Sequence, residues 1–169
     1  DSYICEIAPG RSLRPERCLF EEMIYVVSGR GATTVWNEDG RKQTFEWQAG
    51  SLFSPPLNCW RQHFNGSGSE PARFLAVTSA PLMINLFHNL DFVFQNEFTF
   101  SDRFPEEEGY FLAEGKSYPG RIWDSNFIPD VRAMKLEDWK ERGGGGKNIL
   151  LELSENTMAA HISEFAVGR

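Results

Sequence analysis

One stretch, residues 20–28 (FEEMIYVVS), restricts the fold of this chain more than any other. β-branched and aromatic side chains follow one another there, and from Met23 to Val27 apolar residues occupy both faces of a period-two pattern. An extended strand that is covered on both sides produces this pattern. Because Gly29 and Gly31 interrupt it, the stretch predicts a short central strand within an all-β domain.

Short runs of strand-forming residues surround this strand, and Gly or Pro separates them. The runs are Tyr3 to Ile7, Thr33 to Trp36, Lys42 to Trp47, Ser51 to Ser54, Cys59 to Asn65 and Arg73 to Thr78. Asp39-Gly40 supplies the positive φ values that a tight hairpin turn requires. Many short strands at regular spacing are typical of a sandwich or small barrel, and not of a parallel sheet.

The spacing of a few residues in this region matches two known motifs. Glu22 and Gly29 fit the end of G-x5-H-x-H-x3-4-E-x6-G, and Gly50, Pro56 and Asn65 fit the frame of G-x5-P-x-G-x2-H-x3-N. The chain therefore resembles the cupin superfamily. This resemblance implies a cupin-type jelly-roll β-barrel, also described as a double-stranded β-helix, with one or two short peripheral helices.

The metal positions are where the chain departs from the motifs. In cupins, three His and one Glu point into the barrel and hold a divalent ion. The corresponding residues here are Glu16, Cys18, Glu22 and Arg61. Cys59 and His63 share the parity of Arg61 along their strand, so we expect them to point inward as well.

A first interpretation is that Arg61 has replaced the ion. A guanidinium is permanently charged and cannot coordinate a metal. A buried Glu22 needs a cation, and Arg61 is suited to pair with it through a forked contact.

A second interpretation keeps the ion. Cys18, Glu22 and His63 then bind a divalent transition metal (Fe, Mn, Ni, Cu or Zn), because thiolate, carboxylate and imidazole all ligate such ions. Arg61, Glu16 and Cys59 would line the site for a small organic acid. A fixed positive charge beside a divalent ion is unfavourable by Coulomb's law, which favours the first interpretation and a barrel without a cofactor.

A short repeat links the two ends of the chain. ICEIAPGR at residues 4–11 returns as ISEFAVGR at residues 162–169. Together with EEMIYVVSGRGATTVW and WRQHFNGSGSEPARFLAV, this pattern resembles the amino-terminal half of a bicupin of the gentisate 1,2-dioxygenase-like kind. That resemblance implies ferrous iron held by three His and an aromatic acid substrate, but this barrel lacks the His trio.

Three functions follow as hypotheses. The first is a metal-dependent dioxygenase or related oxidoreductase, by resemblance only. The second is a metal-free module that binds a small acid, and the third is a structural or dimerisation half of a bicupin.

The chain divides by composition into three parts. Residues 1–80 are expected to form the barrel, residues 81–146 a helix and an aromatic-rich connecting segment, and residues 147–169 the first strands of a second repeat. Pro81 marks a helix start, LDFVFQNEFTF alternates like a strand, and residues 102–121 suggest a long loop. A short helix is expected over residues 130–142, followed by a flexible turn at Gly143 to Gly146.

The strands of an incomplete second repeat would leave an open sheet edge, so we expect a homodimer built by strand exchange or sheet extension.

Charge and cysteine content narrow the partners. A net charge of -7 argues against nucleic acid and against an anionic membrane surface. Three Cys match no metal or redox motif, which favours free thiols and a cytoplasmic location.

Overall fold

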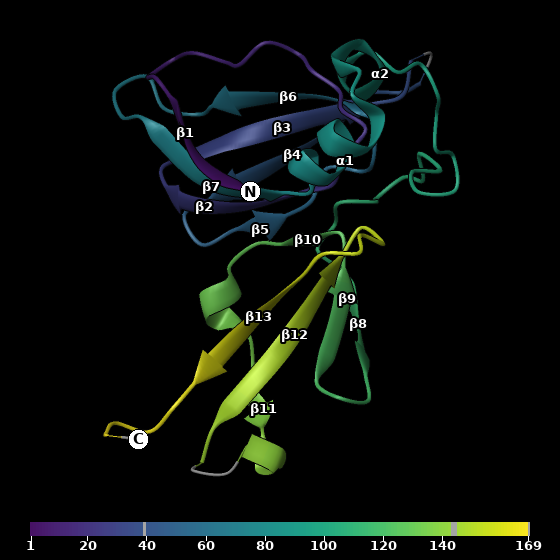
Figure 1. Cartoon of the computed structure of the whole chain (residues 1–169). Helices are drawn as coiled ribbons and strands as arrows, with labels where there is room; N and C mark the ends of the chain where they lie inside the picture. The colour runs from purple at the N-terminus through teal and green to yellow at the C-terminus, as the bar shows by residue number, and fades with distance from the viewer. Residues whose placement is uncertain (39, 143–144, 169) are drawn as a thin grey trace.

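The computed structural model describes residues 1–38, 40–142 and 145–168, and it shows a barrel with a smaller sheet beneath it (Figure 1). The barrel strands are β1 (Ser2–Ile7), β2 (Glu22–Ser28), β3 (Arg30–Trp36), β4 (Gln43–Gln48), β5 (Leu52–Phe53), β6 (Trp60–Asn65), β7 (Ala72–Thr78) and β10 (Phe127–Ile128). Asp39, where the hairpin turn was predicted, lies outside the described residues.

Two antiparallel sheets form the barrel. One has the strand order β1-β7-β2-β5-β10 and the other the order β4-β3-β6. The segment from Ser12 to Glu16 extends the second sheet, because it bridges β6 through Ser12 with Phe64 and Glu16 with Arg61. The two four-stranded layers then have the order 1-7-2-5 and (12–16)-6-3-4, which is the double Greek key of a jelly roll. The predicted all-β, cupin-type jelly-roll barrel is confirmed.

The motif residues form the turns of this barrel. Gly29, between β2 and β3, has φ +82°, and a Cβ there would lie 2.7 Å from the Cα of Ala72. The side-chain amide of Asn65 donates hydrogen bonds to the carbonyl oxygens of Ile7, Ala8 and Glu70. These positions therefore explain the motif spacing by backbone geometry, without reference to a metal.

Apolar side chains fill the barrel interior. Part of the filling comes from the connecting segment, because Phe104 and Phe111 are buried and the ring of Phe111 stacks on Phe45 with centroids 4.1 Å apart. Phe45 also packs against Phe53 and Phe127. These aromatic residues of the connecting segment therefore dock it against the barrel.

Two short helices cover one end of the barrel: α1 (Ala80–Phe87) and α2 (Leu90–Phe94). The expectation of a strand over the start of LDFVFQNEFTF is wrong. The side chain of Asn89 accepts a hydrogen bond from the N–H of Phe92, and this N-cap starts a helix where the alternation suggested a strand. Among the described residues, no helix is long and apolar enough to span a membrane.

The rest of the chain forms a second sheet. Its strands are β8 (Gly115–Tyr118), β9 (Ile122–Ser125), β11 (Glu137–Asp138), β12 (Lys147–Leu153) and β13 (Ala159–Glu164), in the order β11-β12-β9-β8 with β13 beside β12. The predicted long loop thus contains β8 and the turn of the β8–β9 hairpin, which holds Pro119 and Gly120, and β9 follows it directly. Only single 3-10 turns, Val131–Ala133 and Lys140–Arg142, occur where a helix was expected, because the residues between them form β11 and pair with β12. Gly143 and Gly144 lie outside the described residues.

The second sheet is attached to the barrel in two ways. Ile149, Leu151 and Leu153 of β12 pack with Met23 and Leu52 of the barrel. A polar contact adds to this cluster, since the carboxylate of Glu21 accepts hydrogen bonds from the N–H (2.9 Å) and the hydroxyl (2.6 Å) of Thr157. The strands after Gly146 therefore pair with the connecting segment, and their unpaired edge among the described residues is carried by β13.

We predict that Phe104→Ala lowers the free energy of unfolding by about 3–5 kcal/mol, because it leaves a cavity in the barrel interior. Chemical denaturation followed by tryptophan fluorescence measures the change. Phe98→Ala is the matched control: Phe98 lies in the same segment and is 63% exposed. Equal losses for the two variants would show that the segment does not fill the barrel.

Candidate functional site

Four polar residues meet at one place in the barrel. Arg61 lies on β6, Glu22 begins β2, and Glu16 and Cys18 lie on the segment that leads into β2. The backbones of Glu16 and Arg61 form a bridge, with the Arg61 N–H donating to Glu16 O (2.8 Å) and the Glu16 N–H to Arg61 O (3.0 Å). This bridge places the segment against β6 and brings its side chains to the guanidinium.

The Arg61 guanidinium is the centre of this cluster. Its Nη2 lies 2.9 Å from Oε2 of Glu22 and 3.3 Å from Oε1 of Glu16, and its Nη1 donates to Sγ of Cys18 at 3.1 Å. The side chains of Arg61 and Glu22 are 4% and 3% exposed, whereas that of Glu16 is 54% exposed. A buried ion pair thus lies at the metal position of the motifs, with a solvated carboxylate at its edge.

The sequence did not indicate one member of this cluster. The Tyr3 hydroxyl donates a hydrogen bond to Oε1 of Glu22. Tyr3 lies on the inward face of β1, because its partner on β7 is the fully buried Ala76, but at this end of the strand Tyr3 is still 44% exposed. The period-two pattern of β1 could have assigned this face, but no motif connects Tyr3 with Glu22.

Burial and charge act against each other in the cluster. Burial acts to lower the pKa of Arg61, but the neighbouring Cys18, Glu22 and Glu16 outweigh it, so the guanidinium stays charged. Burial raises the pKa of the Cys18 thiol, although Arg61 lowers it in part. Burial and the adjacent Glu22 carboxylate raise the pKa of Tyr3. At neutral pH the thiol and the phenol are therefore protonated around one buried ion pair.

His63 points inward but belongs to a different contact. Its Nδ1 lies 2.8 Å from the hydroxyl of Thr33, which also accepts a hydrogen bond from the Trp47 indole at 2.9 Å. Because the Thr33 hydroxyl accepts from the indole, its own hydrogen is free to go to Nδ1, and the neutral imidazole then carries its proton on Nε2. Burial, reinforced by the charge of Arg61, lowers the pKa of His63 to about 3, so the imidazole is neutral.

Cys59 forms its hydrogen bond with a residue other than Arg61. Its thiol donates to the side-chain oxygen of Asn37 at 3.2 Å. Burial, with the charge of Glu106 adding to it, raises the pKa of Cys59 to about 12. Of the residues proposed to receive an acid, the structure thus brings Glu16 to Arg61, and it gives Cys59 another partner.

The residues proposed as metal ligands do not fit an ion in this arrangement. The guanidinium contacts both Cys18 and Glu22, and His63 uses Nδ1 for Thr33. In residues 1–38, 40–142 and 145–168, no group of three His, Cys, Asp or Glu side chains is arranged to hold a metal. The set of Cys18, Glu22 and His63 stays a prediction that this geometry does not favour.

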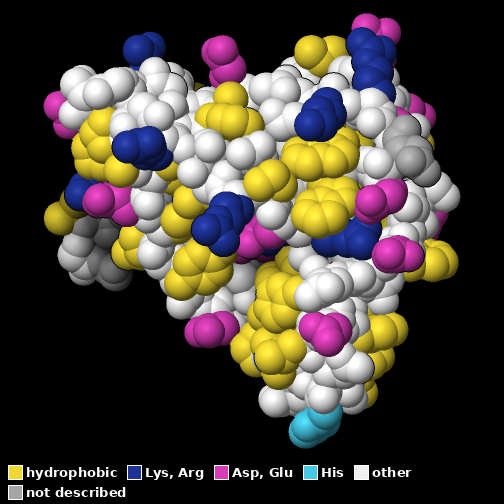
Figure 2. Space-filling model, turned by 90° about the horizontal axis from the view of Figure 1, so that it is seen from above, with side chains coloured by type: hydrophobic (Ala, Val, Ile, Leu, Met, Phe, Trp, Pro, Cys, Tyr) yellow, Lys and Arg dark blue, Asp and Glu magenta, His cyan; other side chains and the backbone are white. Residues whose placement is uncertain are grey.

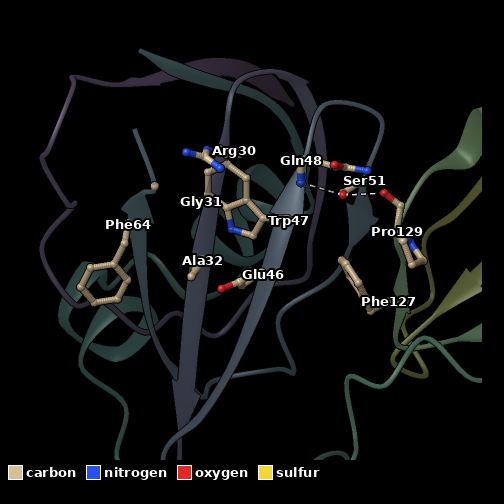
Figure 3. Close-up of a pocket in the computed structure, with 11 residues that line it drawn as sticks. Arg30, Gly31, Ala32, Glu46, Trp47, Gln48, Ser51, Phe64, Phe127 and Pro129 are labelled. Carbon is tan, nitrogen blue, oxygen red and sulfur yellow. Dashed lines mark hydrogen bonds between the residues drawn. The ribbon is translucent and has the colours of Figure 1, made fainter. Parts of the chain in front are cut away.

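The surface has a separate cleft of about 520 Å³ near one end of β3 and β4 (Figure 3). Trp47 and Phe127 line it but are only 3% and 7% exposed, so they offer little apolar area to a ligand. The Ser51 hydroxyl accepts from the Gln48 N–H and donates to Pro129 O. None of the Arg61 cluster lines this cleft.

Comparisons with known proteins give partial overlaps. No protein-family model matches the chain, and no curated protein matches it. Among solved structures, a chain from a study of proton-coupled electron transfer in oxalate decarboxylase is 29% identical (TM-score 0.42, 44% of this chain and 20% of that chain). An oxalate decarboxylase–formate complex from Lactobacillus farciminis is 24% identical (TM-score 0.41, 50% and 28%), and vicilin from hazelnut, Corylus avellana, is 20% identical (TM-score 0.41, 43% and 20%).

The matches therefore span only 20–28% of the length of those proteins. At these TM-scores the overlaps carry no weight in the argument. The assignment of the jelly-roll barrel rests on the strand order of the chain itself.

We predict that His63 makes the protein less stable in acid. The unfolded chain binds a proton at His63 below about pH 6.5, while the folded chain does so only near pH 3, so stability rises with pH across that window. Between pH 7 and pH 5 the wild type should lose about 2 kcal/mol more than His63→Gln, as measured by urea denaturation. The amide oxygen of Gln can still accept from Thr33. Parallel pH curves for the two proteins would contradict the buried neutral imidazole.

Proposed function

We propose that this chain is a metal-free, cupin-type barrel with a structural role, related to one half of a bicupin. The observation that carries the proposal is the Arg61 guanidinium, which lies between Glu22 and Cys18 at the metal position of the motifs. Arg61 gives the buried carboxylate the positive charge that a divalent ion would otherwise provide. It does so without an exchangeable ligand, and so without a site for substrate.

Packing supports this role. Phe104 and Phe111 enter the barrel from the connecting segment and are 0% and 8% exposed. A substrate of aromatic-acid size would need the space that these rings fill, since small-molecule sites measure about 300–1,000 Å³. The rival proposal, a gentisate-type dioxygenase, needs three protein ligands that leave coordination positions of the metal open. This chain has a guanidinium at one of those ligand positions.

One observation favours a second candidate, a metal-free module that binds a small acid. In the part of the chain that is described, the buried Nε of Arg61 has no hydrogen-bond partner, and the Glu16 contact is half exposed to solvent. A ligand carboxylate could displace Glu16 and bind the guanidinium. The net charge of the cluster opposes this, because two carboxylates already surround one cation.

Metal content separates the structural role from the oxygenase. Protein purified without a His tag, after growth in medium supplemented with Fe, Mn, Ni, Cu and Zn, should contain less than about a tenth of an equivalent of any of them. Elemental analysis by mass spectrometry gives the value. A stoichiometric ion that is lost in Cys18→Ala and in His63→Gln would sink the proposal and establish the metal site.

We predict that Arg61→Met lowers the free energy of unfolding by about 3–5 kcal/mol, because it leaves the Glu22 carboxylate buried without a cation. Arg61→Met combined with Glu22→Leu should recover most of that loss, since the pair is then replaced by apolar side chains. Urea denaturation at pH 7 measures each variant. Arg73→Met, which breaks the exposed Arg73–Glu6 pair (2.6 Å), is the control and should cost less than about 1 kcal/mol.

If the double variant were no more stable than Arg61→Met alone, the energy of this site would not come from the ion pair. Equal costs for Arg61→Met and Arg73→Met would contradict the structural role of Arg61.

The acid-binding candidate is tested by thermal shift with a panel of aromatic and aliphatic carboxylates. A structural role predicts an unchanged Tm with every acid at millimolar concentration. An increase in Tm with one acid that disappears in Arg61→Met, and grows in Glu16→Gln, would establish the second candidate instead.

A further inference from the structure

One side of the strand β13 has no neighbouring strand among the residues that the structure describes. Within that part of the chain, β13 is an outer strand of the second sheet and pairs with β12 alone (Figure 1). The Leu150 N–H of β12 donates to Arg121 O on the β9 side (2.7 Å), so Leu150 and its partner His161 form a pair without mutual hydrogen bonds. The N–H and C=O groups of His161, and of Ser163 two residues later, therefore point away from β12 toward the open side.

This edge lacks the features that usually protect an edge strand. β13 runs for six residues without Pro, Gly or Lys. The strand β8, at the other end of the same sheet, has only four residues and contains Gly115 and Lys116. Charged residues and short length discourage the pairing of edges, and a longer edge without them is a template for another strand.

The barrel face beside β13 is apolar and only partly covered. Leu75 and Val77 of β7 line one groove together with Ala160 and Ile162 of β13. Ile4 of β1, which pairs with Leu75, is 69% exposed. Over the barrel as seen from above, by contrast, Figure 2 shows Lys, Arg, Asp and Glu side chains among the hydrophobic ones.

The covered part of this face indicates what completes it. β12 packs against β2 and β5, and β13 packs against β2 and β7. A further strand on the open side of β13 continues the same packing toward β1, the next strand of the barrel sheet. The open backbone edge and the exposed apolar strip thus both call for one added strand with an apolar side.

The strand β13 of a second copy has these properties. A two-fold axis perpendicular to the sheet makes the two strands antiparallel and keeps the same face of each toward its own barrel. When Ile162 lies opposite Ile162 of the second copy, His161 lies opposite Ser163 and Ala160 opposite Glu164, so no like charges meet. In the described part of the chain, the Ser163 hydroxyl has no hydrogen-bond partner, and this register places an imidazole across from it.

We propose that this chain forms a two-fold dimer by sheet extension, in which β13 of each copy pairs with β13 of the other. The outward N–H and C=O groups of His161 and Ser163 exchange hydrogen bonds, and the two second sheets become one continuous sheet. The two-fold axis uses both open edges, so no β13 edge remains for a third copy. The proposal deepens the structural role proposed above by naming its partner, but the oligomeric state is measured independently of metal content, so either can fail alone.

Sedimentation velocity of the full chain over micromolar to millimolar concentrations tests the dimer. Ser163→Pro removes an N–H that faces the second copy and leaves the hydrogen bonds to β12 in place. The matched control is Ser117→Pro, the same substitution on β8, because Ser117 also points its N–H away from the neighbouring strand. The wild type and Ser117→Pro should be dimers, whereas Ser163→Pro should have a dissociation constant raised by about tenfold or more.

Ser163→Ala separates the backbone from the side chain. It keeps the N–H, so it should remain a dimer and raise the dissociation constant by less than about tenfold. Circular dichroism and thermal melting first establish that each variant is folded. A wild type that stays monomeric throughout the concentration range overturns the proposal, and so does a folded Ser163→Pro that associates as tightly as Ser117→Pro.

Hydrogen–deuterium exchange of the wild type gives a test that needs no substitution. The backbone amides of β13 should exchange about tenfold or more slowly in the concentrated sample than in the dilute one, because the dimer protects them, while those of β8 should exchange equally in both. Mass spectrometry of the corresponding peptides measures the rates. A dimer whose β13 amides exchange at the same rate at both concentrations uses another contact and contradicts the proposal.

Discussion

The ion pair between Arg61 and Glu22 is the contact around which the barrel is organised. Taking Glu22 out of water is costly unless a cation lies beside it, and Arg61 supplies that cation at 2.9 Å. The pair also joins two strands of opposite sheets, β6 and β2, and it draws in the preceding segment through Cys18 and Glu16. One side chain thus satisfies a buried charge and connects the two layers of the jelly roll.

The rest of the molecule encloses this pair in apolar surface. Phe104 and Phe111 fill the barrel, and the helices cover Cys18 and Phe20 at one end. At the other face, β12 packs on Met23 and Leu52, and Glu21 binds Thr157. The segment 20–28 is therefore covered inside by the barrel and, at Met23, outside by the second sheet. Such burial favours a scaffold over an open binding site.

The barrel could be predicted from sequence because its signals are local. Period two in β2 and the positive φ of Gly29 act within a few residues, whereas the Asn65 amide, which donates to the distant Ile7 carbonyl, was found through the motif spacing. The convergence of Arg61 with Glu22 followed from strand parity and motif register. Tyr3 was missed because its contact depends on the pairing of β1 with β7, which no motif encodes. Likewise, the Asn89 cap outweighed the alternation after it, and the β8–β9 hairpin depends on parallel pairing with β12.

The central claim is that a guanidinium replaces a metal at the centre of this barrel. X-ray diffraction from crystals soaked in Mn²⁺ or Zn²⁺, with anomalous data collected at the absorption edge, tests it most directly. The account predicts continuous density for Arg61 between Cys18 Sγ and the Glu22 carboxylate, with no anomalous peak there. An anomalous peak within bonding distance of Cys18, Glu22 and His63, with Arg61 turned away, would contradict it.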